Sequence, residues 1–351
     1  AGSAARLAGG ARARGRPLEA VRLSEGSHDD EALAERAAAL AQLGRLDEAE
    51  ALFRSIDGGD ERVRLMVRSG LGAIARARGL YEEAERELRA AIAEAGTAFG
   101  TCSLEAAAAL NALGMVFRYS GRFEEAQELY LRALEVVEAA VGELHPDVAS
   151  IHHNLGGLEH VRGNLDAAAE HARRSVELRR ETVGPAHPAV AEDEAAYAAI
   201  LVGLGRDDEA ERLLRDALGV LEDVLGSAHP ETAAAWNNLA GVLQRRGDYD
   251  AADDAYRRSL EAKERMLGPD HPAVAITLNN LGVNARRRGR PEEAELLYRR
   301  ALAILEGRVE PDHPNLLLTT RNYAKLLREA GREAEADELE RLRKKPPGPA
   351  V

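Results

Sequence analysis

The sequence predicts an all-α protein, a right-handed α-solenoid of about eight helix–turn–helix repeats. Three observations support this fold. The dipeptide His-Pro recurs every 42 residues, glycine and alanine recur in the same frame, and each period contains two stretches with the apolar spacing of an amphipathic helix. Because one short helix pair cannot bury its apolar face alone, the pairs are expected to stack and share a continuous core.

Three kinds of residue set the repeat frame. His-Pro begins at residues 145, 187, 229, 271 and 313. Glycine occupies residues 79, 121, 163, 205, 247, 289 and 331, and an alanine follows each of these glycines five positions later. The chain has only 32 glycines in 351 residues, so seven at one spacing indicate a true repeat.

Each period is predicted to form two helices. In the clearest copy, Leu278, Leu281 and Ala285 recur on one helix face, and Gly289 ends that helix. A second helix begins at Pro291, where proline and the two glutamates after it suit a helix N-terminus. A glycine in the left-handed conformation is predicted to end each second helix. The proline after each repeated histidine has a φ angle suited to the first turn of the helix that begins there. These glycines are residues 142, 184, 226 and 268.

The predicted solenoid covers residues 30–343. Residues 1–29 are rich in Gly, Ala and Arg and are expected to be a flexible N-terminal segment, and residues 344–351 a disordered tail. The first residue is Ala rather than Met, so the sequence leaves open whether an effector domain was removed from either end. The predicted repeats span residues 30–60, 63–102, 103–144, 145–186, 187–228, 229–270, 271–312 and 313–343.

The repeated residues resemble the tetratricopeptide repeat (TPR). The resemblance is carried in each repeat by the equivalents of Leu281, Gly282, Gly289, Ala294, Tyr298 and Ala301. The 42-residue period, with LGPDHPAVAITLNNLG at 267–282 and PEEAELLYRRALAILE at 291–306, is similar to the kinesin-light-chain-like subclass. The resemblance implies a superhelix whose first helices line a concave groove that binds peptides or partner segments. The fifth repeat departs from the pattern, because Ala195 and Ala196 stand where other repeats have Asn-Asn.

Composition and charge exclude several classes of protein. With a net charge of -13, the chain lacks the excess of basic residues that is typical of a nucleic-acid binder. No apolar stretch approaches the ~20 residues of a membrane-spanning helix. Cys102 is the single cysteine, which excludes an intramolecular disulfide framework and indicates a reducing, cytoplasmic location. Only 4 of the 47 basic residues are lysine; this bias, with the abundant alanine, is associated with GC-rich, bacterial genes.

The sequence contains no catalytic or phosphate-binding motif, so we expect no enzymatic activity and no cofactor. The histidines of the His-Pro dipeptides are predicted to cap turns, since equivalent residues on stacked helices lie roughly 10–20 Å apart and cannot share a metal ion. His153 and His160 share one helix face with Gly157 between them, and Glu192 of the next repeat could approach them. These three residues leave a metal site open, although ordinary exposed histidines are the favoured interpretation.

Polar residues opposite the apolar face of the first helices are predicted to line the groove. Asparagine can both donate to and accept from a peptide backbone, and arginine binds carboxylates or phosphates through two hydrogen bonds. We therefore expect a non-catalytic scaffold that binds an extended, acidic partner segment. The predicted groove residues are Asn111, Arg118, Tyr119, His153, Asn154, His160, Asn237, Asn238, Gln244, Arg245, Asn279, Asn280, Arg286, Arg287, Arg321, Asn322, Lys325 and Arg328.

Other functions stay open at this stage. The chain could be the sensor or regulatory module of a larger signalling protein, such as a kinase, NTPase or protease, or the receptor for a short signalling peptide. The polar residues could also be simply solvated helix faces. The sequence identifies neither the partner, nor the pathway, nor the oligomeric state.

Overall fold

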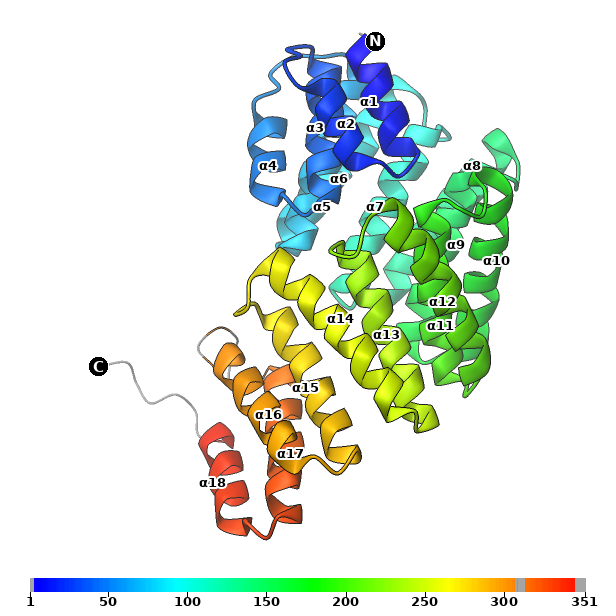
Figure 1. The fold of residues 1–351 in the computed structure, drawn as a ribbon. Helices are drawn as coiled ribbons and strands as arrows, with labels where there is room; N and C mark the ends of the chain where they lie inside the picture. Colours follow the sequence, from blue (N-terminus) through cyan, green and yellow to red (C-terminus); the bar gives the residue numbers. More distant parts are fainter. Residues whose placement is uncertain (1–2, 307, 309–312, 345–351) are drawn as a thin grey trace. The chain divides into compact units, whose positions relative to one another are not determined.

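A computed structural model of the chain describes residues 3–306, 308 and 313–344 (Figure 1). Over this part of the chain there are 18 α-helices and no strand, which confirms the all-α prediction. Of the predicted C-terminal tail, Lys344 is the last residue of a helix, and residues 345–351 lie outside the described residues. The helices are α1 (Ser3–Ala13), α2 (Pro17–Ser24), α3 (Asp30–Gln42), α4 (Leu46–Arg54), α5 (Glu61–Ala77), α6 (Tyr81–Ala98), α7 (Leu104–Tyr119), α8 (Phe123–Val141), α9 (Pro146–Arg162), α10 (Leu165–Val183), α11 (Pro188–Gly203), α12 (Asp207–Val224), α13 (Pro230–Arg246), α14 (Tyr249–Leu267), α15 (Pro272–Arg287), α16 (Pro291–Leu305), α17 (Pro314–Glu329) and α18 (Glu333–Lys344).

The helices from α3 to α18 form eight consecutive pairs, in line with the predicted count of about eight repeats. The odd-numbered helix is the first helix of each repeat and the even-numbered helix is the second. First and second helices pack together, as in α7–α8 and α15–α16, and a second helix also packs on the next first helix, as α6 does on α7. This stacking is that of an α-solenoid, as predicted.

The chain divides into two compact units. The N-terminal unit (Ala1–Leu204) contains α1 to α11, and the C-terminal unit (Gly205–Val351) contains α12 to α18. Every contact described below lies within one of these units.

The structure corrects the expectation for residues 1–29. Instead of a flexible segment, residues 3–24 form α1 and α2, which pack against each other and against α3. Ala5, Ala8 and Ala11 recur every three residues along α1 and are buried. A helix face made only of alanine packs closely without bulky side chains, so composition alone did not reveal it.

The turns between repeats have the predicted chemistry. The Nδ1 atom of each repeated histidine accepts a hydrogen bond from the backbone N–H two residues later, for example from Ala273 to His271 at 3.1 Å and from Asp147 to His145 at 3.2 Å. The glycine at the end of the preceding second helix has a left-handed φ, as at Gly142 (+82°). The histidines therefore act as helix N-caps, as predicted.

A tyrosine on the second helix packs into a glycine on the first helix of the same repeat. Tyr130 of α8 is fully buried, and a Cβ atom added at Gly114 of α7 would lie 2.6 Å from its ring. Tyr298 and Gly282 repeat this arrangement between α16 and α15, again at 2.6 Å. Glycine is required at these positions because the ring fills the space of a side chain.

Candidate functional site

All the predicted groove residues lie on five first helices, α7, α9, α13, α15 and α17. Within each unit, we call the surface formed by these residues, and by residues in the same frame on the other first helices of that unit, its first-helix face. The structure divides its residues into those that bond within the chain and those without such partners.

The asparagines of the first-helix face bond to one another. Asn154 donates to Asn111 at 2.8 Å, in the N-terminal unit. In the C-terminal unit, Asn280 donates to Asn237 at 3.3 Å and Asn322 donates to Asn279 at 2.9 Å. Each bond joins neighbouring first helices, and Asn154 and Asn279 are buried. These asparagines therefore use part of their hydrogen-bonding capacity within the chain, whereas Asn238 makes no hydrogen bond among the described residues.

Three of the predicted groove arginines pair with acids of the chain itself. Arg245 contacts Asp207 at 3.2 Å, and Arg286 contacts Glu329 at 2.8 Å. Arg328 contacts both Asp337 and Glu340 at 3.0 Å. These arginines do not add three uncompensated charges to the first-helix face, because a nearby carboxylate neutralises each. The Gln244 amide is also used, since it donates to Asn284 at 3.3 Å.

Five basic residues of the first-helix face have no acidic partner among the described residues. Arg287, Arg321 and Lys325 are exposed in the C-terminal unit. In the N-terminal unit, Arg76 and Arg118 lie over the ring of Tyr119, with their guanidinium carbons 5.2 and 4.7 Å from its centroid. Tyr119 remains 51% exposed. These contacts are cation–π interactions, which place two positive charges against the aromatic ring.

Sequence reasoning missed Arg76. It precedes Arg118 by 42 residues, and His160 follows Arg118 by the same interval. The repeat frame alone therefore contained the signal for a row of Arg, Arg and His on α5, α7 and α9.

A pocket of about 150 Å³ lies beside His153 and His160, lined by residues of α7, α9, α10 and α11. The carboxylate of Asp193 contacts His153, whereas Glu192, which was predicted to approach, is exposed. The His153 Nδ1 atom lies 2.8 Å from Asp193 Oδ1. Adjacent residues of a helix point about 100° apart, so Asp193 enters the interior where Glu192 does not.

Asp193 is the centre of a buried polar cluster. Its other oxygen, Oδ2, accepts hydrogen bonds from the Ser175 hydroxyl at 2.6 Å and from Arg179 Nε at 2.7 Å. Its side chain is 4% exposed and that of Arg179 is 12% exposed. Burial alone would raise the pKa of the Asp193 carboxyl, but the hydrogen bond from His153 and the charge of Arg179 hold its pKa below the ordinary value. The carboxyl is therefore ionised in the folded protein at neutral pH.

A second pair of histidines was not predicted. The Nδ1 atoms of His152 on α9 and His171 on α10 lie 3.0 Å apart, and both rings are partly buried. Burial first, and then the charges of His171 and Arg174, lower the pKa of His152 to about 4. Burial also lowers the pKa of His171, opposed by Glu170 and Glu159. Neither ring is charged in the folded protein at neutral pH.

This histidine pair predicts acid sensitivity. The unfolded chain binds protons at His152 and His171 below pH ~6.5, whereas in the folded chain His152 resists protonation until about pH 4 and the pKa of His171 is also lowered. Stability therefore falls as the pH drops through that window. We expect a loss of about 1–2 kcal/mol between roughly pH 7.5 and pH 5, measured by urea unfolding. The double variant His152→Gln, His171→Gln should show a flatter pH dependence, and equal slopes for parent and variant would refute this assignment.

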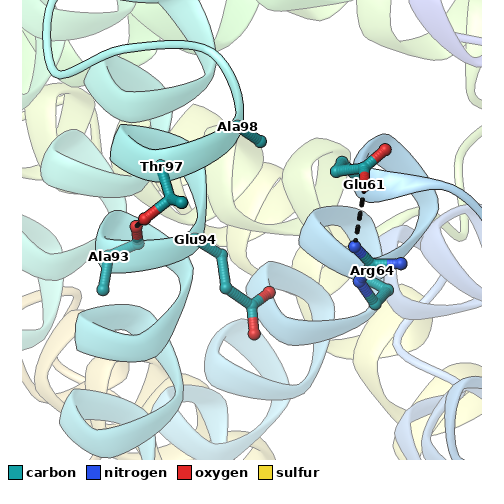
Figure 2. Close-up of a pocket in the computed structure, with 6 residues that line it drawn as sticks. All are labelled: Glu61, Arg64, Ala93, Glu94, Thr97 and Ala98. Atoms are coloured by element: carbon teal, nitrogen blue, oxygen red, sulfur yellow. Dashed lines mark hydrogen bonds and ion pairs between the residues drawn. The ribbon is translucent and has the colours of Figure 1, made fainter.

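A larger hollow in the N-terminal unit is lined by residues of α5 and α6. Figure 2 shows the Glu61–Arg64 ion pair, 3.2 Å long, on α5 and the Glu94 side chain on α6. One Glu94 oxygen, Oε2, is buried without a hydrogen-bond partner among the described residues. The hollow has a volume of about 370 Å³ and is lined by Glu61, Arg64, Ala93, Glu94, Thr97 and Ala98. It does not include any of the predicted groove residues.

Two further searches concern metals and membranes. Over residues 3–306, 308 and 313–344, no three His, Cys, Asp or Glu side chains are placed to share a metal ion. No described helix combines the length and the apolar character needed to cross a bilayer.

Comparison with known families explains the periodic architecture. A family model described as tetratricopeptide repeat matches residues 63–139, 147–223 and 231–307, which is more than half of the chain. The chain belongs to the tetratricopeptide repeat family. Two further tetratricopeptide repeat models match residues 111–181 and 31–55. No curated protein sequence gives a significant match.

Solved structures of tetratricopeptide repeat proteins share the fold. One such structure contains the nearly identical TPR-like repeats of a Podosopora anserina protein described as a kinesin light chain, in a single-substitution variant. It is 22% identical to this chain, with a TM-score of 0.51 over 57% of this chain and 94% of that one. The Cut9–Hcn1 hetero-tetramer of the APC/C contains a chain that is 16% identical, with a TM-score of 0.67 over 91% of this chain and 54% of that one. A Rap protein complexed with competence and sporulation factor is 14% identical, with a TM-score of 0.59 over 95% of this chain and 96% of that one.

At these identities the likeness concerns the fold alone. Tetratricopeptide repeats generally act as protein-interaction scaffolds and generally lack catalytic activity. The chain therefore carries an architecture that serves to bind protein or peptide partners.

Proposed function

We propose that this chain is a non-catalytic scaffold that binds an extended, acidic segment of a partner protein along the first-helix face. The observation that carries the proposal is that the first-helix face of each unit holds basic residues without acidic partners among the described residues, two in the N-terminal unit and three in the C-terminal unit. The chain has 60 acidic and 47 basic residues, so an arginine close to other side chains readily finds a carboxylate of its own chain. Positive charges left uncompensated on one face attract carboxylates from outside.

The N-terminal unit offers the most complete binding surface. Arg76 and Arg118 supply positive charge beside the half-exposed Tyr119 ring. A rigid aromatic ring gives a contact surface for an apolar or aromatic side chain at low cost in conformational entropy, while the two arginines bind flanking acids. The preferred ligand is therefore an acidic segment with one apolar or aromatic anchor.

Two finer statements belong to this proposal. The 42-residue period and the histidine-capped turns support assignment to the kinesin-light-chain-like subclass of tetratricopeptide repeats. The single, exposed cysteine, Cys102, supports a reducing, cytoplasmic location.

The proposal predicts the outcome of a peptide selection. Panning a library of random short peptides against the full chain should enrich sequences rich in Asp and Glu with an apolar or aromatic residue among them. Panning against the variant Arg76→Gln, Arg118→Gln, Tyr119→Ala should lose that enrichment. The matched control is Arg132→Gln, which removes an exposed arginine of α8 that also lacks an acidic partner among the described residues. Enrichment of basic peptides, or equal enrichment with all three proteins, would refute the proposal.

A second candidate is a receptor for a short signalling peptide. Its support is the Rap protein complexed with competence and sporulation factor, whose fold matches nearly the full length of both chains. A receptor predicts that panning converges on one short sequence, and that this peptide binds saturably and makes the chain more compact in small-angle X-ray scattering. A scaffold for diverse acidic segments predicts many enriched sequences without compaction.

A further inference from the structure

The pocket beside His153 and His160 has an unusual distribution of charge. Its lining includes Arg118 from α7, both histidines from α9, and Asp193 from α11. Small apolar residues, among them Ala196 and Ala199 of α11, complete its walls. A small cavity lined by two imidazoles and an arginine without an acidic partner among the described residues is suited to an anion.

Gly157 places the Arg118 guanidinium between the two histidines. Residues 153, 157 and 160 share one face of α9, and a Cβ atom at position 157 would collide with Arg118 Nη1. The guanidinium therefore occupies the place that a side chain at position 157 would take. Its cation–π contact with Tyr119 also restrains it.

The buried carboxylate of Asp193 does not cancel the positive charge of Arg118. Asp193 Oδ1 contacts His153 Nδ1, and Oδ2 accepts from Ser175 and Arg179. The charge of Arg179 offsets that of Asp193. The His153 ring donates its Nδ1–H to Asp193, so Nε2 is the nitrogen left for a ligand, and it donates to an anion when both ring nitrogens carry a proton. The groups left facing the pocket are then Arg118, His153 Nε2 and His160.

We propose that this pocket binds a phosphate monoester group, such as a phosphorylated side chain of a partner segment. The guanidinium fork and two protonated imidazoles offer N–H donors to the three terminal oxygens of a phosphate, whereas a carboxylate has only two oxygens to accept them. The inference deepens the proposed function and rests on it for the partner, but the pocket can be tested without any partner.

The test compares two small probes on the full chain. Isothermal titration calorimetry with N-acetyl-phosphoserine amide and N-acetyl-glutamate amide should show at least tenfold tighter binding of the phosphoserine probe. The imidazole NMR signals of His153 and His160 should shift with the phosphoserine probe.

The most informative variant is Gly157→Ala. Alanine favours a helix over glycine, so the fold is retained, but its methyl group displaces the Arg118 guanidinium. Gly157→Ala and Arg118→Gln should each weaken phosphoserine binding at least tenfold, while Arg132→Gln should leave it unchanged. Circular dichroism melting curves verify that each variant is folded.

Three results would overturn the inference: no saturable binding of the phosphoserine probe, equal affinity for both probes, or affinity that does not change in folded Gly157→Ala and Arg118→Gln. If acidic peptides are nevertheless enriched by panning, only the phosphate pocket is wrong and the scaffold function stands. If the phosphoserine probe binds as expected but panning gives no acidic peptides, the scaffold proposal fails instead.

Discussion

Replacing Asp193 by alanine is expected to destabilise the N-terminal unit by about 3–5 kcal/mol, because the substitution leaves a buried cation without its counterion. Arg179 is 12% exposed and bonds to Asp193 at 2.7 Å. Its other hydrogen bond, to the Ser150 hydroxyl at 3.2 Å, cannot neutralise its charge. Hydrogen–deuterium exchange across α9 to α11 should therefore become markedly faster in Asp193→Ala.

The control for Asp193→Ala is Ser175→Ala. Ser175 also donates to the Ala149 carbonyl at 2.9 Å, but its removal deletes no charge. We expect a loss of about 1–3 kcal/mol for this neutral hydroxyl. The pKa of Asp193 is lowered in the fold, so its contribution is present above the unfolded pKa of about 4 and is lost at more acidic pH. An Asp193→Ala protein as stable as the parent at neutral pH would contradict the buried ion pair.

Replacing Tyr130 by alanine is expected to cost about 3–5 kcal/mol, the range for deleting a large buried aromatic side chain. Tyr130 is fully buried and its ring fills the space above Gly114. The cavity would open between α7 and α8, directly beneath the helix that carries Arg118 and Tyr119. Urea unfolding followed by circular dichroism measures this loss.

The control for Tyr130→Ala is Tyr130→Phe. The Tyr130 hydroxyl is buried without a hydrogen-bond partner among the described residues, and burial raises its pKa. Removing this hydroxyl should therefore leave stability unchanged or slightly increase it. A large loss in Tyr130→Phe, or a negligible loss in Tyr130→Ala, would show that the ring is not a packing element of the repeat.

The architecture was predictable because it recurs within one chain. Turn glycines, capping histidines and apolar helix faces return every 42 residues, so each repeat supports the interpretation of the others. The pair α1–α2 escaped prediction because it precedes the repeat frame and buries small residues such as Ala8 and Ala11. An alanine-rich helix and an alanine-rich linker look alike in composition.

The site was less predictable, since side-chain pairing depends on lengths and angles that periodicity does not determine. The frame places Arg286 on the first-helix face but cannot show that Glu329 of the next first helix reaches it. The polar cluster around Asp193 did leave a signal. Asp193 occupies a frame position that is Ile151 in the preceding repeat and Ala235 in the following one, and both of these are buried. A charged residue at a core position is a reason to search for a buried partner.

The central claim is that acidic segments bind to the unpaired basic residues of the first-helix face, and one measurement tests it directly. A fluorescently labelled acidic peptide from the panning selection is titrated with the parent, with Arg76→Glu, Arg118→Glu, and with the control Arg132→Glu, and its anisotropy is recorded at low and high salt. We expect the double charge reversal to weaken binding at least tenfold, about 1.4 kcal/mol, the control to bind as the parent does, and high salt to reduce the difference. Equal affinity for the parent and the double variant, or a loss of affinity as large in Arg132→Glu, would contradict the account.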